Sequence, residues 1–220
     1  MRKGKCNMLS LVYKDFYQTR KVLIFCLVIW AVFLGIGMIN GAEGGASLVY
    51  SFGIIMVNTV LTRILYNEDR YQGTYFMKTL PIKSSLIVTS KFVGGFILVA
   101  GSSLMTCLAA SIICRMGLHG LTSKDVATAT LMSFAFTLVF CGVFLRLYFA
   151  YGYAKVAQYM VLATIGIVII VSVIISTLKE LSTAMTLTAI MNQPYWIAIF
   201  PIIAIIVYIE CWRSALRRFK

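Results

Sequence analysis

The side chains that could do chemistry gather in one polar segment, residues 66–91, with the sequence Y-N-E-D-R-Y-Q-G-T-Y-F-M-K-T-L-P-I-K-S-S-L-I-V-T-S-K. The acids Glu68 and Asp69 come first, and four bases follow: Arg70, Lys78, Lys83 and Lys91. Residues 72–80 are long enough for about two turns of helix, which Pro81 ends. The residues just before it, 67–69, suit a helix start because they supply a cap and negative charge.

The helix predicted over 72–80 carries Phe76, Met77 and Leu80 on one face, because residues three and four apart lie together. A short helix with such a face is suited to dock into a groove on another protein. The alternative interpretation is a solvated connector whose aromatic residues lie on the membrane surface. The residues of this segment leave both interpretations open.

Templates for catalysis are missing from the sequence. There is no G-x-x-x-x-G-K-[ST] loop, so the chain does not bind ATP in that way. His119 is the single histidine, and no H-E-x-x-H or cysteine–histidine set predicts zinc. None of the seven acids lies mid-way along an apolar stretch, as intramembrane proteases and most proton-coupled carriers require. We expect no enzyme activity, and no cofactor or metal bound by this chain.

Three charged residues lie near the ends of apolar stretches: Arg63, Arg146 and Glu210. Glu210 could pair with either arginine inside a helix bundle, whereas snorkelling to the membrane surface explains all three without pairing. Asn58 and Thr59 are polar residues within an apolar stretch, and they could face a partner helix or a substrate path.

Composition points to an integral membrane protein. Of the 220 residues, 60% are hydrophobic and 12% are charged, and the mean hydropathy is +0.91. Charged residues make up about a quarter of an ordinary soluble domain. The net charge of +13 comes from basic residues between apolar stretches, which favours membrane orientation over nucleic-acid binding. The six cysteines show no close pairing and are expected to be small core residues.

The apolar stretches predict an all-α protein, a single transmembrane domain over 1–220 with six membrane-spanning helices. Their expected ranges are 22–39, 47–65, 87–114, 126–147, 159–178 and 195–212. Residues 1–21 are basic and amphipathic, with Leu9, Val12 and Phe16 on one face, and predict an interfacial helix. A signal peptide is the competing interpretation of the amino-terminal region. Glycines that permit close helix contact occur in two spans, at positions 35, 37, 94, 95 and 101.

The distribution of basic residues predicts the orientation. With six spans, both termini share one side with the 66–86 loop and residues 148–158. That side holds all 20 lysines and arginines except Arg115, Lys124 and Lys179. By the positive-inside rule this side is cytoplasmic, and Lys91 is expected to snorkel toward it.

The polar segment resembles the region after the second helix of ATP-binding-cassette (ABC) type-2 permeases. In that family an acidic residue, a short helix, a Leu-Pro pair and a Ser-Lys that opens the third helix recur in this order. The matching residues here are Glu68, the 72–78 stretch, Leu80–Pro81 and Ser90–Lys91. The amino-terminal L-V-Y-K-D-F, with Lys14 and Asp15, is similar to the family's entry segment. The small compact form is similar to bacterial exporters of phenol-soluble-modulin and antimicrobial peptides.

The resemblance implies a permease in a bacterial cell membrane, which forms the translocation path with a second permease chain. Two separate ATPase subunits would bind ATP and Mg²⁺ and receive the 72–80 coupling helix. Its contact residues would be Glu68, Asp69, Arg70, Tyr75, Phe76, Met77, Lys78, Leu80 and Pro81. An apolar bundle, in which we expect no buried charge, suits an amphipathic or lipid-like cargo better than a sugar or an ion.

Two other classes of function remain open at this point. One is a scaffold or immunity protein that sequesters a peptide in the membrane, and the other is a channel or carrier without a partner. Dependence on an ATPase subunit separates the permease from both.

Overall fold

The computed structural model describes residues 8–39, 42–71, 83–115, 123–158 and 194–219, and all long elements in these ranges are helices. They are α1 (Met8–Ile39), α2 (Ala42–Arg70), α4 (Ser84–Arg115), α5 (Ser123–Tyr151) and α8 (Pro194–Arg218). The described part contains no strand, so the all-α prediction is confirmed.

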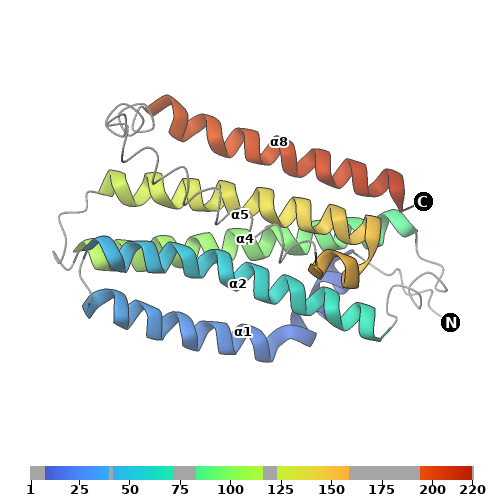
Figure 1. Cartoon of the computed structure of the whole chain (residues 1–220), viewed down its shortest axis with the longest axis horizontal. Coiled ribbons are helices and arrows are strands. Elements are labelled where there is room, and N and C mark those ends of the chain that lie inside the picture. Colours follow the sequence, from blue (N-terminus) through green and yellow to red (C-terminus); the bar gives the residue numbers. More distant parts are fainter. Residues whose placement is uncertain (1–7, 40–41, 72–82, 116–122, 159–193, 220) are drawn as a thin grey trace.

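The five helices lie side by side as one bundle, with the start of α1 and the end of α8 at the same end (Figure 1). Helix α4 contacts each of the other four, and α5 also packs along α8. The end of α2 and the start of α4 lie at the bundle end that carries the termini (Figure 1). This arrangement brings three polar segments together in one region: the start of α1, the end of α2 and the start of α4.

Three of the described helices are long and apolar enough to cross a membrane. They cover Ser84–Ile112, Val126–Tyr151 and Ile199–Arg218. The expected spans at 22–39 and 47–65 fall within α1 and α2, and the one at 159–178 lies outside the described residues. The six-span arrangement therefore stays a prediction.

The structure corrects the expected boundaries at both polar segments. The interfacial helix and the first span form one continuous helix, α1, whose first turns bend away from the axis of the rest (Figure 1). Helix α2 continues to Arg70, so residues 67–69 form its last turn and do not start a helix. Helix α2 still packs against the rest of the bundle close to its end, where Leu65 is fully buried. The predicted short helix at 72–80 lies outside the described residues.

The inner face of the α1 amino-terminal turns also differs from the expected one. Leu9 is 69% exposed, although it was expected on the apolar face with Val12. The buried side chains of these turns are Leu11, Val12, Asp15 and Thr19. Asp15 and Thr19 therefore form a polar pair on the face that packs on the bundle. Asp15 contacts charged partners there, and Thr19 Oγ1 donates a 2.8 Å hydrogen bond to the Asp15 carbonyl oxygen.

The core around α4, α5 and α8 centres on Tyr208. Its hydroxyl donates a 2.5 Å hydrogen bond to the carbonyl oxygen of Phe92, and the two rings pack edge to face at 5.5 Å. This bond satisfies a phenol hydroxyl in apolar surroundings, where an unpaired polar group is costly. The ring lies in a space left open by glycine: a Cβ at Gly142 would lie 2.8 Å from Tyr208 Cδ2.

The structure separates the glycines that matter for packing from those that do not. Among the expected ones, Gly95 lies in a tight contact with Cys141, whereas Gly35 and Gly101 have nothing within 4 Å of an added Cβ. Gly53 and Gly142, which the sequence analysis did not single out, lie at close contacts. A grouping of glycines in the sequence is thus a weaker indication of close helix packing than a single glycine that lies opposite a large ring in the structure.

We predict that Gly142→Ala destabilises the bundle, because the new methyl group would overlap Tyr208. The cost of overpacking a tight core is about 1–3 kcal/mol. The matched control is Gly101→Ala on α4, which adds the same methyl group in open space and should leave stability unchanged or slightly raised. Thermal unfolding in detergent, followed by size-exclusion chromatography, measures both. Equal melting temperatures for the two variants would contradict the packing described.

Candidate functional site

A buried ion cluster joins α1, α2 and α4 at the bundle end that carries the termini. Lys91 Nζ donates a 2.6 Å hydrogen bond to Asp15 Oδ2. The same nitrogen lies 2.5 Å from Glu68 Oε1, a close ionic contact that is not aligned as a hydrogen bond. One ammonium group therefore holds two carboxylates that come from two other helices.

The cluster is shielded from solvent. The side chains of Lys91 and Glu68 are each 4% exposed, and that of Asp15 is 8% exposed. Two carboxylates against one ammonium leave one negative charge, which Lys14 balances at 3.8 Å from Asp15 Oδ1 and 3.7 Å from Glu68 Oε1. Lys14 is 47% exposed, so it remains partly hydrated. Buried charges persist where partners compensate for their lost hydration, and the two lysines do so here.

The cluster lies at the base of the segment between α2 and α4. Glu68 stands in the last turn of α2, and Lys91 stands about two turns into α4. The two residues therefore bracket residues 71–83, and Asp15 connects this bracket to α1. A displacement of the segment would reach all three helices at one point.

These positions correct three expectations. The bundle was expected to contain no buried charge, but the cluster buries three charged side chains. Lys91 does not snorkel toward the surface but is buried between acids from other helices. Glu68 was expected on an accessible polar rim and is buried instead. Asp15 was noted only as part of the entry segment, although its spacing of three and four from Val12 and Leu11 places it on the buried face.

The other residues expected at an ATPase contact divide into two groups. Asp69 and Arg70 are exposed at the end of α2, where Arg70 lies over the Tyr71 ring at 5.9 Å. The rest lie outside the described residues: Tyr75, Phe76, Met77, Lys78, Leu80 and Pro81.

The structure does not bring the three helix-end charges together. Glu210 pairs with Arg213 on its own helix, at 3.1 Å from Nη1 to Oε1, and both side chains are exposed. Arg146 lies within hydrogen-bond reach of the Cys211 thiol. Arg63 lies over the Tyr66 ring, 5.5 Å from its centroid. Within the described ranges, no ion pair joins Glu210 to either of the two expected arginines.

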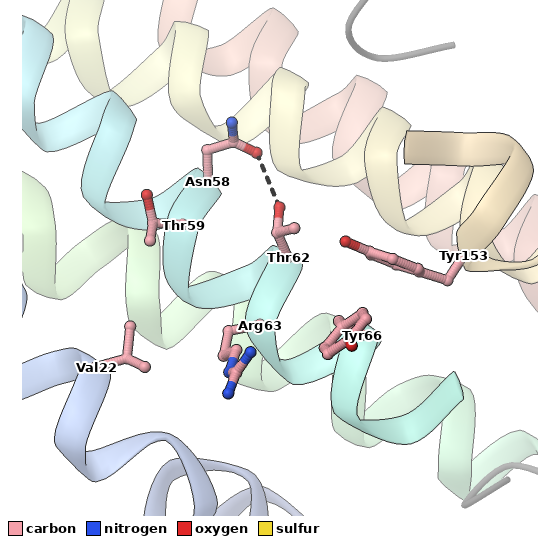
Figure 2. A pocket seen from close by; sticks show the side chains of 7 residues that line it. All are labelled: Val22, Asn58, Thr59, Thr62, Arg63, Tyr66 and Tyr153. Carbon is pink, nitrogen blue, oxygen red and sulfur yellow. Dashed lines mark hydrogen bonds between the residues drawn. The ribbon is translucent and has the colours of Figure 1, made fainter. Parts of the chain in front are cut away.

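Arg63 belongs instead to an open cavity of about 610 Å³ beside α2 (Figure 2). Its lining comes from α1, α2 and the short helical stretch 153–158: Val22, Asn58, Thr59, Thr62, Arg63, Tyr66 and Tyr153. Asn58 and Thr59, which the sequence singled out as possible path residues, both line it. Apart from Val22, the lining side chains carry polar groups, although most of the cavity surface is apolar.

The described part of the chain contains no group of three or more His, Cys, Asp or Glu side chains that could hold a metal ion. The polar contacts described above are ion pairs and hydrogen bonds. Both polar features, the ion cluster and the cavity, share α2.

The family described as "ABC-2 family transporter protein" matches residues 10–220 of this chain. No curated protein and no solved structure matches it.

We predict that Lys91→Met lowers the free energy of unfolding by about 3–5 kcal/mol, because it leaves two buried carboxylates without their main partner. The control Lys83→Met removes an exposed lysine just before α4 and should have little effect. A triple variant, Asp15→Leu, Glu68→Leu and Lys91→Met, should regain most of the lost stability, since no buried charge remains. Unfolding midpoints in detergent test this, and a Lys91→Met variant as stable as Lys83→Met would rule out the buried pairing.

Proposed function

Because the chain belongs to the ABC-2 transporter family, we propose that it is the membrane permease subunit of an ATP-driven exporter. The observation that carries this proposal is the family match over residues 10–220, which covers nearly the whole chain. Three described helices apolar enough to span a membrane support it.

In this proposal, separate ATPase subunits bind ATP and Mg²⁺, and two permease chains form the path. The ATPase docks on the segment between α2 and α4, through the apolar face of Phe76, Met77 and Leu80. Tyr75 and Pro81 flank that face, while Asp69, Arg70 and Lys78 form its polar rim. Two observations support the location. Helix α2 ends and α4 begins at the end of the bundle where α1 begins and α8 ends (Figure 1), and the side chains of Asp69, Arg70 and Lys83 are exposed next to the segment.

The buried ion cluster would transmit the movement. A push on the segment reaches α2 next to Glu68 and α4 close to Lys91, and these two side chains are in contact. Asp15 passes the same displacement to α1. Because the contacts are short and buried, the three helix ends would move as one body. Glu68 thus acts behind the docking surface and not on it.

The rest of the proposal concerns orientation and cargo. In the proposal, both termini and the docking segment lie in the cytoplasm of a bacterial cell, with six spans in the plasma membrane, and the excess of basic residues on that side supports this orientation. Cargo would be an amphipathic peptide of the antimicrobial type, released to the outside.

The experiment is a detergent pull-down of the tagged native chain from its own cells, with bound proteins identified by mass spectrometry. We expect an ATPase subunit with the native chain and at least a tenfold loss of it with the double variant Phe76→Asp and Met77→Asp, because charge is excluded from an apolar groove. The control Thr74→Asp adds charge on the other side of the predicted helix and should retain the ATPase.

Absence of an ATPase from the well-folded native chain would overturn the proposal. A membrane scaffold that sequesters a peptide would then be the leading hypothesis.

A further inference from the structure

Arg63 gives one end of the cavity beside α2 a positive charge. Arg63 forms no ion pair with a carboxylate among the described residues, and its guanidinium group lies over the Tyr66 ring. The other described bases near this end of the bundle include Lys14 and Lys91, which are neutralised by acids. A guanidinium group presents planar donors that match a carboxylate in two parallel hydrogen bonds. The cavity therefore offers one site for an anion.

The wall that leads from Arg63 toward the middle of α2 carries hydrogen-bonding groups among apolar surface. Thr62 Oγ1 donates to Asn58 Oδ1 at 3.4 Å, and Thr59 Oγ1 donates to the Ile55 carbonyl oxygen at 2.8 Å. These bonds leave the Asn58 amide nitrogen, which points away from Thr62, as a donor and the threonine oxygens as acceptors (Figure 2). This alternation of donors and acceptors matches a peptide main chain.

Two tyrosines close the other side of the cavity. The rings of Tyr66 and Tyr153 meet edge to face, 5.6 Å apart, and the Tyr153 hydroxyl points toward α2 (Figure 2). Burial is the main factor that raises the pKa of Tyr153; Tyr66 and Asp69 raise it further, while Arg63 lowers it. The phenol thus stays protonated at neutral pH and can donate to a carboxylate.

The length of the cavity sets the size of the ligand. Asn58 and Tyr66 are eight residues apart on α2, which corresponds to about 12 Å along the helix axis. An extended chain covers this distance in about three to four residues. The volume of about 610 Å³ is in the range of small-ligand sites.

We propose that this cavity binds the free carboxyl terminus of a peptide cargo, with the terminal carboxylate on Arg63 and the last three or four residues along Asn58 and Thr62. The inference rests on the proposed function, because it specifies the cargo of the permease. An anionic lipid would place its phosphate on Arg63 as well. Its acyl chain would fit the apolar part of the lining, but it would leave the polar groups of Asn58 and Thr62 without hydrogen-bond partners, which a peptide main chain supplies.

The test measures binding of a fluorescent amphipathic helical peptide to the purified chain in nanodiscs of zwitterionic lipid, without ATPase or ATP. The peptide is prepared with a free carboxyl terminus and with a terminal amide. We expect the free acid to bind about tenfold more tightly, as one charged hydrogen-bonded contact supports. Arg63→Gln should abolish the difference between the two forms. Arg213→Gln removes an exposed arginine on α8 and should preserve it.

A second arm uses nanodiscs that contain an anionic phospholipid. The free-acid preference should persist there if the site takes a peptide, and disappear if the lipid phosphate occupies Arg63. Equal binding of acid and amide in both kinds of nanodisc, by a native chain that still captures its ATPase, would overturn the inference while the proposed function stands. Failure to capture the ATPase would count against the proposed function and leave this binding result interpretable on its own.

Discussion

The contact of Lys91 with Asp15 and Glu68 is the interaction on which the arrangement of α1, α2 and α4 depends. Two carboxylates in apolar surroundings repel each other unless a base lies between them. The position of Lys91 on α4 therefore sets where α1 and α2 can lie along it. Apolar contacts between helices tolerate small shifts, but an ion contact at 2.5–2.6 Å between buried groups does not. The cluster thus specifies one register among several that hydrophobic packing allows.

Helix α4 carries a second polar anchor next to the first. The residue after Lys91 is Phe92, whose carbonyl oxygen accepts the hydrogen bond of Tyr208 from α8, and whose ring packs on Phe149 near the end of α5. Two consecutive residues of α4 therefore connect it to all four other described helices. A movement that enters at this point can reach the whole bundle, whereas one that enters mid-helix meets mainly apolar side chains.

The sequence was sufficient to predict the helices, but not the side-chain contacts between them. Long apolar runs predict helices because a membrane allows the chain few other forms. No local pattern shows that Lys91 meets an acid 76 positions away, or that Tyr208 reaches a carbonyl 116 positions away. The expected rim position of Glu68 was wrong because a helix end was placed before it. Asp15, Glu68 and Lys91 nevertheless belong to the segments on which the family resemblance rested, and their contact gives these scattered positions a common physical reason.

Helix α2 places the ion cluster and the cavity within a short distance of each other. Glu68 and Arg63 are five residues apart, about 7.5 Å along the axis, and point to different sides of the helix. Glu68 faces the cluster and Arg63 faces the cavity. A rotation or tilt of α2 imposed at Glu68 must therefore also move Arg63 and Tyr66 relative to Tyr153, which stands on another segment. In the proposed exporter, the force that arrives from the ATPase side would change the cavity directly, without a chain of intermediate contacts.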